Sequence, residues 1–170
     1  MSRSQQWAEL LEGSAQKNEA RDCTVKALAA ATGLSYSDCH AAMAKHGRKP
    51  KRGSHCYTME KAAKSLGFQM IRQDRSSYSA KTCRTAPRDR RLAAMGSVIL
   101  ATSGHVAALV DGEVIDWTTG RLHRIQTVYQ IKPIPGHVPA VIDRSTLPAG
   151  SDRWQSFTKY NKRDNLDMFA

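Results

Sequence analysis

The chain has 170 residues, a formal net charge of +11 and a hydrophobic fraction of 41%. This length suits one domain with a sizeable core, and no apolar run approaches the roughly 20 residues of a membrane span. Residues 1–7 lack the apolar stretch of a secretory signal, which predicts a cytoplasmic protein without membrane contact. The excess positive charge predicts attraction to acidic partners or polyanions.

The first part of the chain has the patterns of four helices. Asp22 is a good N-cap for the second helix, and Ser35 or Ser37 is expected to cap the third. Gly33 and Gly67 follow the second and fourth helical patterns, where a glycine commonly ends a helix. The expected helices therefore cover residues 4–12, 22–32, 35–45 and 58–66.

Strand-like patterns follow the helices, with a polar segment at 73–91 that is expected to be irregular. The Asp111-Gly112 pair between two apolar runs is a strong hairpin signal. Helices first and antiparallel strands second predict an α+β fold with the helices packed on one side of a small antiparallel sheet. The expected strands cover residues 68–72, 97–101, 105–110, 113–117 and about 128–133.

The predicted domain covers residues 1–135. From residue 136 the composition shifts to Pro, Gly and polar residues, which predicts a partly ordered C-terminal tail over 136–170.

Cys23 is a candidate nucleophile because it falls in the first turn of the predicted second helix. Unpaired amide hydrogens and the helix dipole stabilise a thiolate at that position. His105 opens a predicted strand and would supply the imidazole that activates a thiol. If Asp111 and Gly112 form a two-residue turn, Asp116 is a diagonal neighbour of His105 on one sheet face. Asp116 would then orient the imidazole.

These residues also carry a family resemblance, which extends over residues 16–131. The Asp22-Cys23-Thr24 stretch resembles the nucleophile motif of C39-like peptidases in the papain-like superfamily, and the segment from Gly104-His105 to Asp116 resembles their histidine–aspartate hairpin. The chain is also similar to small papain-like proteins that bacteriophages encode, including its Gly47-Arg48-Lys49 turn.

The resemblance implies a papain-like fold and a thiol-dependent hydrolase with a Cys23–His105–Asp116 triad. It implies a protein or peptide substrate cleaved at a peptide or isopeptide bond, no metal or organic cofactor, and the host cytoplasm if a phage encodes the protein. The basic charge favours an acidic substrate. A glutamine upstream of the cysteine donates to the oxyanion in C39-like enzymes, and here Gln16 or Asn18 would take that role beside the backbone amide of Cys23.

Two alternatives stay open. A catalytically inactive papain-like binding protein would have the same motifs. Residues 25–45 also match helix-turn-helix spacing, and a net charge of +11 would supply phosphate affinity for a nucleic-acid-binding protein. A second basic cluster covers residues 81–91. The residues expected to contact nucleic acid in this alternative are Lys45, Arg48, Lys49, Lys51 and Arg52.

The four cysteines are expected to be reduced in a cytoplasmic protein. No metal site is predicted, because the cysteine and histidine positions give no CxxC or HxxxH pair. The possible metal ligands among them are Cys39, His40, His46, His55, Cys56 and Cys83.

Overall fold

The computed structural model describes residues 2–137, which form an α+β fold as the sequence pattern predicts. Five strands form one antiparallel sheet in the order β1-β5-β2-β3-β4. The helices are α1 (Arg3–Gln16), α2 (Cys23–Thr32), α3 (Tyr36–Lys45), α4 (Cys56–Ser65) and α5 (Arg90–Ala94). The strands are β1 (Phe68–Arg72), β2 (Ser97–Thr102), β3 (His105–Val110), β4 (Glu113–Ile115) and β5 (Ile125–Pro133). Residues 138–170, and with them nearly all of the predicted tail, lie outside the described part of the chain.

The helix signals in the sequence act as expected at most boundaries. Ser35 caps α3, and Gly33 ends α2 in the left-handed conformation with a φ of 72°. The first helix runs on to Gln16, beyond the predicted end at residue 12. Gly13 does not break it, because this position packs against α3: a Cβ there would lie 2.8 Å from the Cβ of Tyr36. Gly13 therefore serves the close approach of two helices.

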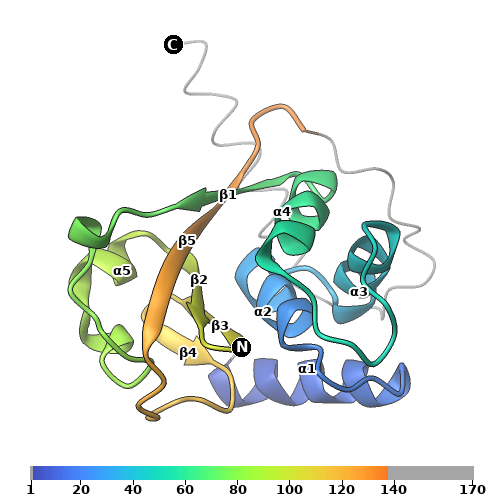
Figure 1. Cartoon of the computed structure of the whole chain (residues 1–170), viewed down its shortest axis with the longest axis horizontal. Coiled ribbons are helices and arrows are strands. Elements are labelled where there is room, and N and C mark those ends of the chain that lie inside the picture. Colours follow the sequence, from blue (N-terminus) through green and yellow to red (C-terminus); the bar gives the residue numbers. More distant parts are fainter. Residues whose placement is uncertain (1, 138–170) are drawn as a thin grey trace.

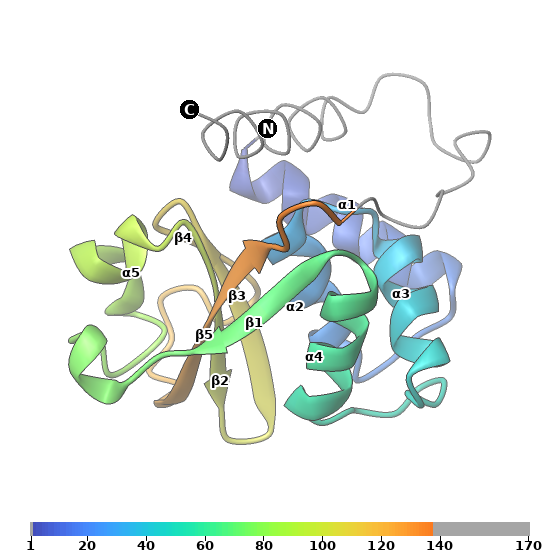
Figure 2. The same cartoon turned by 90° about the horizontal axis from the view of Figure 1, so that it is seen from above.

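The sheet is covered on both faces, which corrects the expectation of helices on one side. Helices α1 to α4 lie on one face, and the segment from η1 (Arg75–Ser77) through η2 (Ala86–Arg88) to α5 lies on the other (Figures 1 and 2). Alternate residues of the central strands enter separate cores: Val106 and Ala108 pack with the helices, and Ala107 and Leu109 pack with Leu92. The 73–91 segment, which was predicted to be irregular, contributes its apolar residues to this second core.

Two tight hairpins set the register of β2, β3 and β4. Val110 pairs with Glu113 across the predicted Asp111-Gly112 turn, whose residues have φ values of 49° and 81°. The turn at Ser103 and Gly104 likewise pairs Thr102 with His105. Within residues 2–137, none of the helices combines the length and the apolar character needed to cross a membrane.

Candidate functional site

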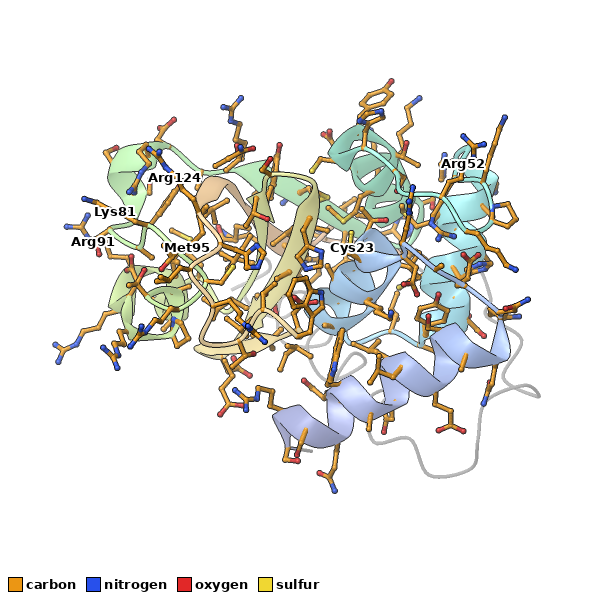
Figure 3. The ribbon with its side chains drawn as sticks, turned by 60° about the horizontal axis from the view of Figure 1, so that its bottom comes forward. Cys23, Arg52, Lys81, Arg91, Met95 and Arg124 are labelled. Atoms are coloured by element: carbon orange, nitrogen blue, oxygen red, sulfur yellow. The ribbon has the colours of Figure 1, made fainter. Side chains whose placement is uncertain are left out.

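Cys23 is the first residue of α2, and its side chain is half-buried. Helix α2 packs on β3, with small residues such as Ala27 and Ala108 in their shared core. Strand β4 pairs only with residues 108–110 of β3, so the beginning of β3 has an open edge on that side. The start of α2 lies against the beginning of β3, and the thiolate of Cys23 accepts a hydrogen bond from the Val106 amide. Figure 3 shows Cys23 in the middle of the molecule.

His105 lies directly after the Ser103-Gly104 turn, and Gly104 allows that turn with a φ of 69°. The Nε2 atom of His105 is 2.8 Å from Oδ2 of Asp116. Because Nε2 faces the carboxylate, Nδ1 is the ring nitrogen left for the Cys23 thiol. The Oδ2 atom of Asp116 also accepts bonds from the Thr118 amide at 3.0 Å and the Thr118 hydroxyl at 2.6 Å. These bonds fix the carboxylate that orients the ring.

The electrostatics of the pair favour a thiolate and an imidazolium. Burial alone would raise the pKa of the Cys23 thiol, but hydrogen bonds from His105 and from the Val106 and Thr24 amides lower it below its ordinary value. Burial would likewise lower the pKa of His105, whereas the bonds to Asp116 and Cys23 raise it to about 9. Both shifts favour the thiolate–imidazolium pair over the neutral thiol and imidazole.

The thiol opens into a pocket of about 490 Å³. Its walls come from the start of α2, the loop at residues 53–56, the turn between β2 and β3, and residues 126–129 of β5.

Cys56 is a second thiol in the same pocket, and sequence reasoning gave it no role there. Like Cys23, it is the first residue of a helix and is half-buried. Its pKa is nevertheless raised, mainly by burial and then by the nearby charge of Cys23. Cys23 differs from Cys56 in its hydrogen bonds to His105 and to the Val106 amide, which lower its pKa.

Gln16 and Asn18, the predicted oxyanion donors, do not line this pocket. Both are exposed, and the Gln16 amide donates to Glu12 one turn back along α1 at 3.1 Å. Asn18 adopts a left-handed conformation with a φ of 49°, which turns the chain after α1. The pocket wall instead holds Ser54, whose hydroxyl lies 2.8 Å from the hydroxyl of Thr24.

The loops on either side of Cys23 are tied together by a buried ion pair. Both Glu19 carboxylate oxygens accept from the Arg48 guanidinium, at 3.0 and 2.9 Å. His40 and the Lys51 amide complete the set at 2.7 Å each. The hydrogen bond from Arg48 holds the pKa of Glu19 at about 2, against the opposing effect of burial. This cluster fixes the loop that leads to Ser54 and Cys56.

Asp22 precedes Cys23 and is buried. It occupies the N-cap position of α2 without the expected capping bond from its side chain. Its carboxylate instead accepts from Lys26 at 2.8 Å and from the Tyr36 hydroxyl at 2.6 Å. Asp22 thus links the start of α2 to α3.

Trp117 contacts His105 with a distance of 5.1 Å between ring centroids, while half of its surface, 51%, stays exposed. His123 packs edge-on against Trp117 at 5.2 Å. In the sequence, the signal for this neighbour was a tryptophan directly after Asp116.

The residues of the helix-turn-helix alternative do not form an exposed DNA-recognition surface. Helix α2 is buried along most of its length, and the Arg48 side chain, 1% exposed, is bound to Glu19. Lys45, Lys49, Lys51 and Arg52 are exposed. Removing Arg48 from this set corrects the predicted nucleic-acid contacts, because a buried and paired guanidinium cannot reach a phosphate.

The four cysteines are free thiols, as expected. Cys39 lies in the core beneath the helices, and Cys83 lies in the core on the opposite face of the sheet. In the range 2–137, no three histidine, cysteine or acidic side chains form a group that could hold a metal ion.

Comparison of the chain with protein-family models, with curated proteins and with solved structures gives no match.

Proposed function

We propose that this protein is a thiol-dependent hydrolase of the papain-like type, acting on peptide or isopeptide bonds. The observation that carries the proposal is the hydrogen-bonded series from Cys23 through His105 to Asp116. A thiol of lowered pKa, an imidazole beside it and a buried carboxylate behind the imidazole are the groups that acyl transfer requires. The helical layer that presents the thiol to a strand bearing the histidine is consistent with a papain-like arrangement.

The chemistry follows from the charged pair. The Cys23 thiolate attacks the substrate carbonyl, and the oxyanion forms beside the N–H groups at the start of α2. The His105 imidazolium gives its Nδ1 proton to the leaving amine, and the C–N bond breaks to leave a thioester on Cys23. Neutral His105 then takes a proton from water, which attacks the thioester and releases the acid. Asp116 holds the ring in place through both steps.

Alkylation of the thiols tests the site directly. In the wild type we expect iodoacetamide to modify Cys23 with an apparent pKa below the ordinary thiol value of about 8.5, because His105 stabilises the thiolate. His105→Ala should return that pKa toward the ordinary value or above it, since burial is then opposed only by the Val106 and Thr24 amides. Peptide mass spectrometry over a pH series measures each cysteine separately.

Cys56 is the matched control for this measurement. It shares the pocket, the helix-start position and the partial exposure of Cys23, but its pKa is raised. An acidic thiol at both positions, or at neither, would contradict the proposal. Turnover is then measured on a mixture of peptides, where Cys23→Ala must abolish cleavage. An acidic Cys23 with no cleavage would instead favour the inactive binding protein.

We further propose that the Ser54 hydroxyl joins the backbone amide of Cys23 as an oxyanion donor. Thr24 can donate to Ser54, which frees the Ser54 hydrogen for the pocket that both Ser54 and Cys23 line. Ser54→Ala should lower kcat by roughly 10- to 100-fold while the alkylation pKa of Cys23 stays unchanged. Gln16→Ala should change kcat by less than about twofold, since that side chain bonds Glu12. A large loss of kcat in Gln16→Ala, with Ser54→Ala unaffected, would instead assign the oxyanion donor to Gln16, as the sequence predicts.

A further inference from the structure

Six basic side chains gather at one end of the molecule, around η2 and α5. They are Lys81, Arg84, Arg88, Arg90, Arg121 and Arg124, here called the basic end surface. All six are exposed, and their side chains form no hydrogen bond or ion pair with any other residue in the 2–137 range. Figure 3 shows Lys81 and Arg124 at the end of the molecule opposite Arg52, with Cys23 between them.

Backbone pairing brings two separate segments together in this surface. The Arg84 amide donates to the Arg121 carbonyl at 2.9 Å, and the Ile125 amide donates to the Lys81 carbonyl at 2.9 Å. An isolated bridge also joins Thr82 and Arg124. This backbone pairing keeps the positive charges of the 81–91 cluster next to those of residues 121–124.

The one acid within the 81–91 cluster does not neutralise it. Asp89 is buried, and its carboxylate accepts five hydrogen bonds from Ser79, Ala80, Arg91 and Leu92. Burial would raise the pKa of Asp89, but these bonds hold it at about 2. Asp111 and Glu113 are exposed acids at the margin, on the hairpin whose Gly112 lies near Pro87. Cations outnumber exposed acids on this surface.

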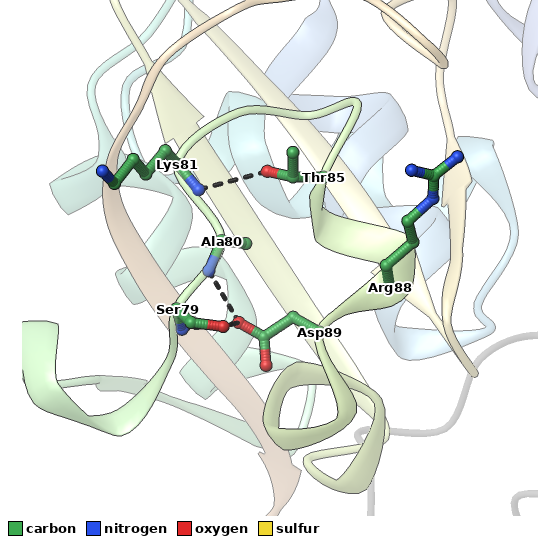
Figure 4. Close-up of a pocket in the computed structure, with 6 residues that line it drawn as sticks. All are labelled: Ser79, Ala80, Lys81, Thr85, Arg88 and Asp89. Carbon is green, nitrogen blue, oxygen red and sulfur yellow. Dashed lines mark hydrogen bonds between the residues drawn. The ribbon is translucent and has the colours of Figure 1, made fainter.

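The directions in which the basic side chains point favour an extended ligand over a small anion. Figure 4 shows a shallow pocket of about 310 Å³ in which Asp89 turns toward Ser79 and Ala80, while Lys81 and Arg88 point away from its two sides. Cations that converge would suit one small anion. Cations that diverge across a surface match a chain of phosphates.

The composition of the surface favours nucleic acid over an acidic polypeptide. Protein partners are anchored by aromatic and large apolar side chains, and the exposed ones near this surface are Leu122 and Trp117, of which Trp117 is half covered by its contacts with His105 and His123. Interfaces with nucleic acid are more polar and more positively charged. Single strands are bound by stacking successive bases on several aromatic rings, whereas the exposed ring beside this surface within residues 2–137 is Trp117, which packs against His105 and His123. A duplex contacted through its backbone therefore fits best.

We propose that the basic end surface binds the phosphate backbone of a double-stranded nucleic acid. The site is separate from the thiol pocket and does not depend on the proposed hydrolase activity. It also differs from the 45–52 loop, where Arg48 is committed to Glu19.

The test compares two triple variants of the full chain that remove the same charge. One carries Arg84→Ala, Arg88→Ala and Arg124→Ala, and the control carries Lys45→Ala, Lys49→Ala and Arg52→Ala. Affinity for a 20-base-pair DNA duplex and the matching RNA duplex is measured by fluorescence anisotropy from 50 to 200 mM salt. Poly-glutamate of similar charge serves as the competing polyanion, and circular dichroism checks that both variants are folded.

We expect the first variant to bind at least about tenfold more weakly than the wild type and to lose roughly 2.7 from the slope of log K against log salt. The control variant should stay within about threefold, and Cys23→Ala should bind as the wild type does. Equal losses in both triple variants would overturn the assignment to this surface. Failure to bind either duplex at 50 mM salt, or equal competition by poly-glutamate, would overturn nucleic acid as the ligand.

Discussion

In Asp116→Asn we expect kcat to fall by roughly 100-fold or more while the protein stays folded. The amide oxygen can still accept from His105 and Thr118, so the geometry around Oδ2 is preserved and only the charge is lost. The carboxylate is a principal cause of the raised pKa of His105. Without it the imidazolium is less stable, and the population of the thiolate–imidazolium pair shrinks.

The pH dependence of activity should also change in Asp116→Asn, and the direction of the change follows from the two pKa values. Activity requires the thiolate and the imidazolium together, so the wild-type profile rises through the lowered pKa of Cys23 and falls through the His105 pKa of about 9. In Asp116→Asn the pKa of His105 should move down toward its ordinary value of about 6.5. The alkaline limb then shifts to lower pH.

The profile of kcat/KM against pH measures this shift, and Asp111→Asn is the matched control. Asp111 is an exposed carboxylate in the same hairpin, and asparagine tolerates its φ of 49°. We expect that variant to keep the wild-type limbs. An alkaline limb that stays in place in Asp116→Asn would show that His105 does not depend on this carboxylate.

The triad candidates could be found from the sequence because the signals that place them are local. Cys23 follows an N-cap residue, and the Asp111-Gly112 turn fixes the register that relates His105 to Asp116. The meeting of Cys23 with His105 depends on the packing of α2 against β3, which no local pattern encodes. The family resemblance, not the spacing, suggested that contact.

The rest of the pocket comes from segments that are distant in the sequence. Ser54 and Cys56 enter from a loop held by Glu19 and Arg48, and such pairing over long separations leaves no periodic signal. The prediction of Gln16 and Asn18 rested on their proximity to Cys23 in the sequence, and neither residue lines the pocket. The chain turns through left-handed residues at Asn18 and Arg21 before it reaches Cys23.

Replacing Glu19 by alanine should have the largest effect on stability, a loss of roughly 3–5 kcal/mol. The Arg48 side chain is 1% exposed, and Glu19 is the carboxylate that pairs with it. Arginine stays charged at any accessible pH, so the variant leaves a buried cation without its counter-charge. Urea unfolding measures the change. Glu12→Ala is the control, because that glutamate is exposed on α1 and its side chain accepts from the exposed Gln16.

Two further measurements separate the ion pair from simple packing. The pKa of Glu19 is lowered from 4.5 to about 2, so its contribution is complete above pH 4.5 and is lost as the pH falls toward 2. The wild type should lose stability over that interval, and Glu19→Ala should lose less. The double variant Glu19→Leu with Arg48→Met removes both charges and should recover much of the loss, since apolar residues of similar volume can replace a buried pair. If the double variant is as unstable as Glu19→Ala, the loss of stability comes from altered packing of the loop and not from the unpaired charge of Arg48.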